Sequence, residues 1–215
     1  MKVTYTTFLY TSLTLFWLLS IQLFGQSKSD TLSYDLFVND EIIGEMFIVK
    51  NMKSDSTYNY LAISNADYRL LFAFHIQFSY LTSFDSRGVY QSSEFSYYLN
   101  SKKKESNLIR REGNKFNVYE EGKIKKVIEN PLNHTTMEMY FNEPTEEAWV
   151  FSERFCDNFK IEKEGVDNYK IDFPGGFTSH YYYKKGKCFK IKINTLISDM
   201  EFRLRKHNPP LYSEK

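Results

Sequence analysis

The alternation of apolar and polar residues along most of the chain is the feature that most restricts its fold. Within the segment 70–84, five aromatic or aliphatic residues stand at successive alternate positions and would share one face of an extended strand: Phe72, Phe74, Ile76, Phe78 and Tyr80. A helix repeats every 3.6 residues and could not gather these side chains on one face. The period therefore predicts half-buried β-strands and argues against a mainly helical fold.

Short turn signals separate the alternating runs. Asn100-Ser101, Glu121-Gly122 and Lys185-Gly186 each stand between β-prone segments, as in hairpin turns. We therefore predict an all-β, mainly antiparallel fold of about a dozen strands. A sheet of that size has to curl, split or close, so we expect a strongly curved sheet or half-barrel.

Residues 135–142 are the exception to the β pattern. This stretch combines threonines and a glutamate with apolar residues, and it predicts one short helix of two turns. Pro144 disfavours helical geometry in the residue before it, so the helix should end there. A helix stop that returns the chain to the sheet is the favoured interpretation, and a gate beside a pocket is the alternative.

The N-terminus differs from the rest of the chain. A positive start at Lys2 precedes an uncharged, largely apolar run over residues 8–24, and Gly25 follows. This layout predicts a signal peptide over residues 1–25, cleaved after Gly25, and thus export to the periplasm or secretion. An uncleaved anchor is the alternative, because the run is near the lower limit for spanning a bilayer.

The rest of the chain predicts one domain over residues 26–206. No second run approaches membrane-spanning length, so contact with a membrane would be peripheral after removal of the signal. The prolines after Asn208 predict an irregular tail over residues 207–215. The formal net charge of +1 comes from Lys2 alone, so the mature chain would be neutral. A neutral chain argues against non-specific nucleic-acid binding.

Several short patterns follow one another along the chain. They are Tyr34-Asp35, Ile43-Gly44-Glu45, Leu70-Leu71-Phe72, Tyr140-Phe141-Asn142-Glu143-Pro144, Phe151-Ser152-Glu153-Arg154-Phe155 and Tyr181-Tyr182-Tyr183 before Gly186-Lys187. Together they resemble a domain-of-unknown-function family of exported proteins from Bacteroidota. The likeness covers about residues 32–205. It implies export and a curved antiparallel sheet similar to the half-barrels of lipoprotein carriers, and it brings no catalytic residue with it.

Metal and catalytic chemistry find little support. The four histidines, His75, His134, His180 and His207, lack the short spacings that place two ligands on one metal, so we expect no metal and no cofactor. Ser152-Glu153 and Ser179-His180 lack the local context of a nucleophile. We therefore predict no catalytic residue. A hydrolase remains the weakest alternative, since a triad can assemble from residues far apart in sequence.

The two cysteines leave one question open. Export favours oxidation, and a bond between Cys156 and Cys188 would close a long loop. In a simple meander, however, their strands would be three places apart, roughly 14 Å at about 4.8 Å per strand. A disulfide needs Cα atoms within about 7 Å. The family resemblance also places other residues at these positions, so a bond would be peculiar to this chain.

Aromatic residues make up 18% of the sequence and exceed what one sheet face can use. Rings on a second face could line a concave cavity for an acyl chain, stack on sugars or pack on a neighbouring strand. This surplus predicts a non-catalytic envelope protein that binds an apolar or amphiphilic, lipid-like ligand in the concave face of its sheet. The ligand-lining candidates are Phe72, Phe74, Phe78, Tyr98, Tyr181 and Tyr183.

Charge is unevenly distributed and supports a second hypothesis. The charged residues of segment 101–127 are mainly basic. Those of segment 128–159 are all acidic except Arg154, and several lysines lie between residues 184 and 192. The alternative function is thus a structural or interaction module that presents a charged face to an envelope protein or glycan. Its candidates are Lys184, Lys185 and Lys187. Lysines that merely keep exposed strands soluble would give the same pattern.

Overall fold

The structure is a computed structural model that describes residues 28–69, 73–195 and 198–206. It consists almost entirely of β-strands. These are β1 (Lys28–Val38), β2 (Glu41–Met52), β3 (Tyr58–Arg69), β4 (Ala73–Phe84), β5 (Tyr90–Leu99), β6 (Lys102–Glu112), β7 (Lys115–Glu120), β8 (Lys123–Ile128), β9 (Trp149–Ser152), β10 (Asp157–Lys160), β11 (Glu162–Gly165), β12 (Asn168–Phe173), β13 (Phe177–Lys184), β14 (Lys187–Asn194) and β15 (Met200–Leu204).

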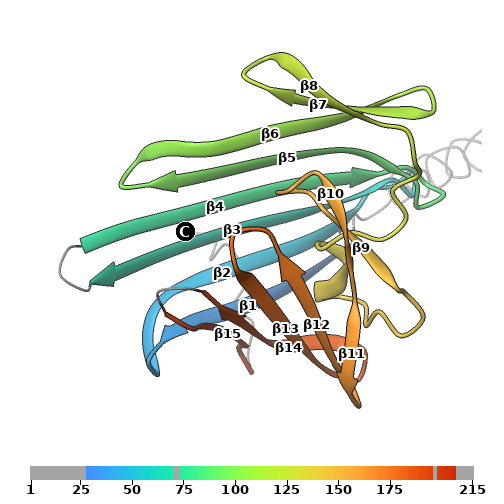
Figure 1. The fold of residues 1–215 in the computed structure, drawn as a ribbon. Coiled ribbons are helices and arrows are strands. Elements are labelled where there is room, and N and C mark those ends of the chain that lie inside the picture. The colour runs from blue at the N-terminus through green and yellow to red at the C-terminus, as the bar shows by residue number, and fades with distance from the viewer. Residues whose placement is uncertain (1–27, 70–72, 196–197, 207–215) are drawn as a thin grey trace, which may run out of the picture.

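One 13-stranded antiparallel sheet carries the fold, in the order β11-β12-β13-β14-β15-β1-β2-β3-β4-β5-β6-β7-β8. The first strand pairs with the last, so the sheet is built outward from β1 in both directions. Among the described strands, β8 and β11 form the two edges and do not pair, so the sheet curves without closing into a barrel (Figure 1). The predicted curved, antiparallel all-β fold is confirmed.

Two-residue turns join several neighbouring strands, as the sequence indicated. Asn39-Asp40, Asn100-Ser101 and Lys185-Gly186 have positive φ at both positions, between 50° and 75°. This geometry matches the right-handed twist of the flanking strands and favours Asn, Asp and Gly. The turns therefore fix the register of the hairpins that they close.

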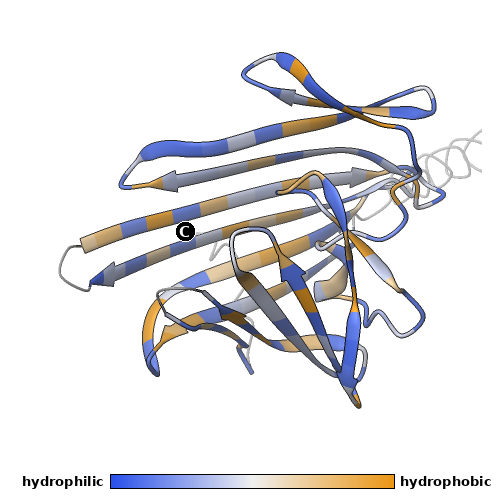
Figure 2. Ribbon diagram, in the orientation of Figure 1, coloured by the Kyte–Doolittle hydropathy of each residue, from blue (hydrophilic) through white to orange (hydrophobic). Residues whose placement is uncertain are grey.

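Burial alternates along the strands, and the buried face is the concave one. Leu32, Tyr34 and Leu36 on β1 are at most 3% exposed. On β3 and β4, by contrast, Ile63 and Leu81 of the convex face are 43% and 40% exposed. Figure 2 shows the same alternation of hydropathy along the long strands. The core therefore lies inside the curve of the sheet.

Gly44 is required where β2 passes close to β3. A Cβ atom at this position would lie 2.1 Å from the backbone oxygen of Asn65, closer than any real contact. Gly44 pairs with Ala66 on one side and with Leu36 on the other, next to a bulge at Ile43 of β2. The glycine of the Ile43-Gly44-Glu45 pattern thus permits close packing of the central strands.

The chain between β8 and β11, residues 129–161, crosses the concave face, and we call it the crossing segment. It contains the separate β9–β10 hairpin and a 3-10 helix, η2 (Glu138–Tyr140). Figure 1 shows it at one end of the curved sheet, to the right in this view, whereas the tips of β3–β4 and β5–β6 extend to the left. The crossing segment thus divides the concave face into a covered part and an uncovered part.

The predicted two-turn helix over residues 135–142 is wrong in length, because only η2 forms there. The buried side chains explain the difference. Met137, Met139 and Phe141 are 2%, 0% and 8% exposed, so burial follows every second residue. A longer α-helix would turn one of them away from the core. The helix does end before Pro144, as expected.

Several predictions lie outside the described residues. They are the signal peptide over residues 1–25, the ligand candidate Phe72 and the tail over residues 207–215. Within the described part of the chain, no helix has the length and apolar character needed to cross a membrane.

Both cysteines are free and buried. Cys156 closes the β9–β10 turn with a φ of 53°, and Cys188 lies on β14, in the main sheet. The open question of a disulfide is therefore answered in favour of two thiols, although the simple meander assumed for their spacing does not form, because β10 pairs with β9 outside the main sheet.

Candidate functional site

The crossing segment covers one end of the concave face, which we call the closed end. Aromatic side chains of the sheet line this end: Tyr58, Tyr60, Phe84, Tyr90 and Phe116. Phe151 of β9 packs edge-on against Tyr90 with ring centroids 6.0 Å apart, and Phe141 lies 5.4 Å from Tyr60. The closed end is therefore filled by the protein's own side chains.

The other end of the concave face, which we call the open end, is lined by Phe74, Ile76 and Phe78 of β4 and Leu99 of β5. The paired residues Ile76 and Leu99 place β4 and β5 side by side here. All four side chains are only half-buried. Apolar groups are therefore left partly exposed inside the curve, in a region that the crossing segment does not cover.

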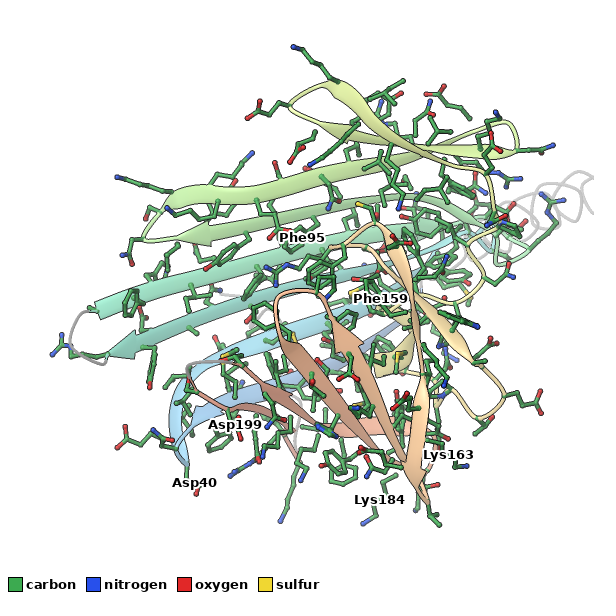
Figure 3. All side chains as sticks on the ribbon, viewed as in Figure 1. Asp40, Phe95, Phe159, Lys163, Lys184 and Asp199 are labelled. Carbon is green, nitrogen blue, oxygen red and sulfur yellow. The ribbon has the colours of Figure 1, made fainter. Side chains whose placement is uncertain are left out.

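Arg154 lies where the closed and open ends meet. It follows β9, and its guanidinium donates through Nε and Nη2 to Glu105 of β6, with a shortest distance of 2.9 Å. Aromatic rings surround it, with centroids 5.1–6.0 Å from the guanidinium carbon, and they belong to Phe78, Phe95, Tyr97, Phe155 and Phe177. Such stacking holds the positive group in a fixed position among apolar neighbours. Figure 3 shows Phe95 beneath the crossing segment.

Glu153, next to Arg154, points into the closed end and is fully buried. Its carboxyl group accepts hydrogen bonds from the hydroxyls of Thr82 and Thr136 and from the backbone N–H of Met137. Burial raises its pKa, and the hydrogen bond from Thr136 acts in the opposite direction. These three partners tie the crossing segment to β4, so Glu153 has a structural role.

Two small cavities flank Arg154. One, of about 120 Å³, opens among residues of the central strands, and the other, of about 130 Å³, lies beside β12 and β13. Both are lined by Tyr80, Tyr140, Arg154 and Ile193, so they adjoin each other. Burial raises the pKa of Tyr80, while the nearby Arg154 acts in the opposite direction. The two cavities combine apolar walls with tyrosine hydroxyls and one cation.

Ser64 adds an unusual feature to the 120 Å³ cavity. The side chain lines the cavity and is only 3% exposed, and its Oγ has no hydrogen-bond partner among the described residues. A buried hydroxyl without a partner is unfavourable and usually has a role to explain it. Here it lies in the wall of a cavity that Arg154 also lines.

A larger cavity is a weaker candidate. It measures about 500 Å³ and lies beside β5, β6 and β7, where β7 pairs with only the second half of β6. Exposed charges of both signs line it, among them Glu94, Lys103 and Arg110. This surface offers no consistent charge, so we do not place the site there.

The structure separates the predicted ligand-lining residues. Phe74 and Phe78 lie on the concave face, at the open end. Tyr181 and Tyr183 also face inward, but they are 5% and 3% exposed, and the Tyr183 hydroxyl donates to the backbone oxygen of Met139, 2.8 Å away. Tyr98 pairs with Gln77, on the convex face. The strand alternation that places Phe78 inside thus places Tyr98 outside.

The predicted basic residues lie at the β13–β14 turn, far from Arg154. Lys184 and Lys185 are exposed, and Lys187 forms an ion pair with Asp30, 2.9 Å away. Figure 3 places Lys184 at the side of the molecule away from Phe95. Elsewhere the basic and acidic segments neutralise each other: Lys115 pairs with Glu129 and Lys126 with Asp157. Part of the charge segregation therefore serves to hold the crossing segment.

Sequence reasoning missed Arg154 and Ser64 as site residues. Arg154 carried a signal, because it is the single lysine or arginine in the acidic segment 128–159. Ser64 carried none, since a serine in an alternating strand does not reveal whether its hydroxyl finds a partner. Within the described residues, no group of three or more potential ligands is arranged to hold a metal ion.

Comparison with known proteins supports the fold and the family. A family model described as a domain of unknown function (DUF6134) matches residues 34–205. None of the curated proteins matches the sequence. Among solved structures, a β-barrel-like protein of the domain of unknown function DUF1849 from Brucella abortus is similar, with a TM-score of 0.52 and 12% identity. The match covers 82% of this chain and 95% of that one. At this identity the likeness shows the fold alone.

Proposed function

Given that the chain belongs to the family described as a domain of unknown function (DUF6134), we propose that it is a non-catalytic binding protein for an amphiphilic, lipid-like molecule. The predicted membership of an uncharacterised family is confirmed by the match, whereas origin in Bacteroidota and export stay predictions. The apolar part of the ligand would lie over the open end, and its polar end would reach the cavities beside Arg154.

The observation that carries the proposal is the uncovered apolar strip that leads to a cation. Phe74 and Phe78 remain half-buried inside the curve, and the cavity that includes Phe78 also includes Arg154. Apolar surface partly open to water beside a few convergent polar groups is the usual character of a ligand site. Each cavity is smaller than the roughly 300 Å³ of a typical pocket, so it would hold one end of a ligand.

The proposal places the protein in the cell envelope. The apolar run and Gly25 within residues 1–25 support export, as does the family resemblance. An exported, peripheral protein would meet lipids and other amphiphiles at a membrane surface. Detection of the chain in the periplasmic fraction, shortened by residues 1–25, would test this part of the proposal.

Native mass spectrometry of gently purified protein tests ligand binding. We expect an adduct of lipid-like mass on the wild type that is lost or reduced in Phe78→Glu, because a charge would stand in the apolar strip. Leu81→Glu is the matched control, since Leu81 lies on the same strand and is 40% exposed on the convex face. Equal adducts on both variants, or none on the wild type when amphiphiles are added, would refute the proposal.

The second candidate is the interaction module. It is favoured by the exposed Lys184 and Lys185, which form no ion pair with a described residue, whereas Lys187 pairs with Asp30. Reversal of both charges should then abolish crosslinking to an envelope partner while ligand adducts persist. Unchanged crosslinking would count against this function.

A further inference from the structure

We propose that the ligand of the site beside Arg154 carries a carboxylate head group, so that its class is that of long-chain carboxylates. This inference rests on the proposed function and adds to it the chemistry of the ligand's polar end. Three features of the 120 Å³ cavity point to it: a fixed cation with donors to spare, an unpartnered buried hydroxyl, and an apolar exit along β4.

The guanidinium of Arg154 has spare donor capacity. Glu105 engages Nε and Nη2, and a guanidinium carries five N–H donors. Glu105 approaches from β6, whereas the cavity lies on the side of β2 and β3. A second carboxylate can therefore approach the group from the cavity, as bidentate recognition of carboxylates by arginine allows.

Ser64 supplies a donor that no described residue uses. Its Oγ is buried and unpartnered in the wall that Arg154 also lines. A carboxylate oxygen at this point would accept its hydrogen bond and remove the penalty of an unmet donor. A hydroxyl head group would gain the same bond and gain much less from the cation, so the pair of groups selects a carboxylate.

The size and walls of the cavity fit the end of such a molecule. About 120 Å³ admits a carboxylate with its nearest carbon atoms, and Met46, Ala62 and Phe202 give those carbons apolar neighbours. Phe78 belongs to both the cavity and the open end, so a chain that leaves the cavity continues over β4. The small side chains of Ala62 and Ser64 on β3 leave this space beneath the larger residues of β4.

Competition against a neutral fluorescent probe, N-phenyl-1-naphthylamine, tests the inference. Dodecanoate, dodecanol and dodecyltrimethylammonium share a tail and differ in charge. At a pH where the carboxylate is ionised, we expect dodecanoate to displace the probe at concentrations about tenfold lower than dodecanol, the effect of one charged hydrogen bond. The ammonium compound should be the weakest competitor.

Variants of the cavity residues test whether the preference for dodecanoate over dodecanol arises in the 120 Å³ cavity. Ser64→Ala should reduce the preference for dodecanoate several-fold without loss of stability, because the hydroxyl has no partner in the free protein. Arg154→Met combined with Glu105→Gln should abolish the preference, and the paired change avoids leaving a lone carboxylate. Ser79→Ala, on the convex face of the neighbouring strand, is the matched control.

The outcomes separate this inference from the proposed function. Equal competition by dodecanoate and dodecanol, or a preference for the ammonium compound, would overturn the carboxylate inference and leave amphiphile binding intact. Failure of all three compounds to bind would overturn both. A preference for dodecanoate that survives Ser64→Ala and the paired variant would place the head group elsewhere and would also overturn the inference.

Discussion

The two ends of the concave face share one architecture and differ in what covers them. At the closed end, the crossing segment packs Phe141 and Phe151 into the aromatic lining of the sheet. At the open end, Phe74 and Ile76 have the same alternating pattern but are only half-buried. Apolar alternation therefore marks a concave face without revealing whether the chain itself or something else fills it.

Polar contacts hold the crossing segment at the boundary between the closed end and the open end. Asn107 of β6 donates to the backbone oxygen of Arg154, 2.8 Å away, and Lys126 of β8 donates to that of Cys156, 3.0 Å away. These bonds hold the β9–β10 hairpin against the N-terminal half of the sheet. The same hairpin carries Arg154 and Phe155, so the element that closes one end also presents the cation to the other.

The largest predicted effect compares a phenylalanine from each end. Phe151→Ala should lower the free energy of unfolding by about 3–5 kcal/mol, because Phe151 is fully buried and leaves a cavity. Phe74→Ala should cost about 1 kcal/mol or less, since that ring is half-buried outside the core cluster. Urea denaturation of both variants gives the comparison. Similar losses would show that the open end is packed as firmly as the closed end.

A second prediction concerns pH and the carboxyl group of Glu138. At the closed end it accepts a hydrogen bond from the backbone N–H of Thr135, 3.0 Å away, and burial raises its pKa from 4.5 to about 7. The folded protein thus binds this proton more tightly than the unfolded chain. Its contribution to stability is complete below about pH 4.5 and is lost as the pH rises towards 7.

Glu138→Gln should remove this dependence. The variant's free energy of unfolding relative to wild type should rise by up to about 3 kcal/mol between pH 4.5 and 8. Glu129→Gln is the control, because Lys115 lowers the pKa of Glu129. The Glu129 carboxylate therefore stabilises the fold above its ordinary pKa, and the free energy of unfolding of this variant relative to wild type should fall as the pH rises. Parallel curves for wild type and Glu138→Gln would mean that Glu138 titrates alike in the folded and unfolded states.

Much of the fold follows from local sequence, and the site does not. The hairpin turn predicted at Lys185-Gly186 joins β13 and β14, because the alternating residues specify the two strands and these two residues specify the turn. The path of the crossing segment depends on contacts far apart in sequence, such as Tyr183 with Met139. No local pattern encodes such contacts, so sequence did not place Arg154 at the boundary between the two ends.

The aromatic surplus shows the same limit. The surplus of rings made Tyr98, Tyr181 and Tyr183 ligand candidates alike. In the structure, Tyr183 belongs to the core. Tyr98 lies on the outer surface, where Lys103 Nζ is 5.9 Å from the centroid of its ring. The number of rings does not assign their separate roles, because these depend on which face the curve encloses.

The smallest predicted effect sets two neighbours in sequence against each other. Tyr97 stacks on Phe78 with ring centroids 4.8 Å apart and lies 5.8 Å from the Arg154 guanidinium, inside the curve. Tyr97→Ser should lower the free energy of unfolding by about 1–2 kcal/mol and weaken probe binding at the open end. Tyr98→Ser, one residue further along on the convex face, should cost about 0.5 kcal/mol and leave binding unchanged. If binding falls equally in both variants, the ligand is held by the strand as a whole, and the distinction between the enclosed and the outer face does not decide where it lies.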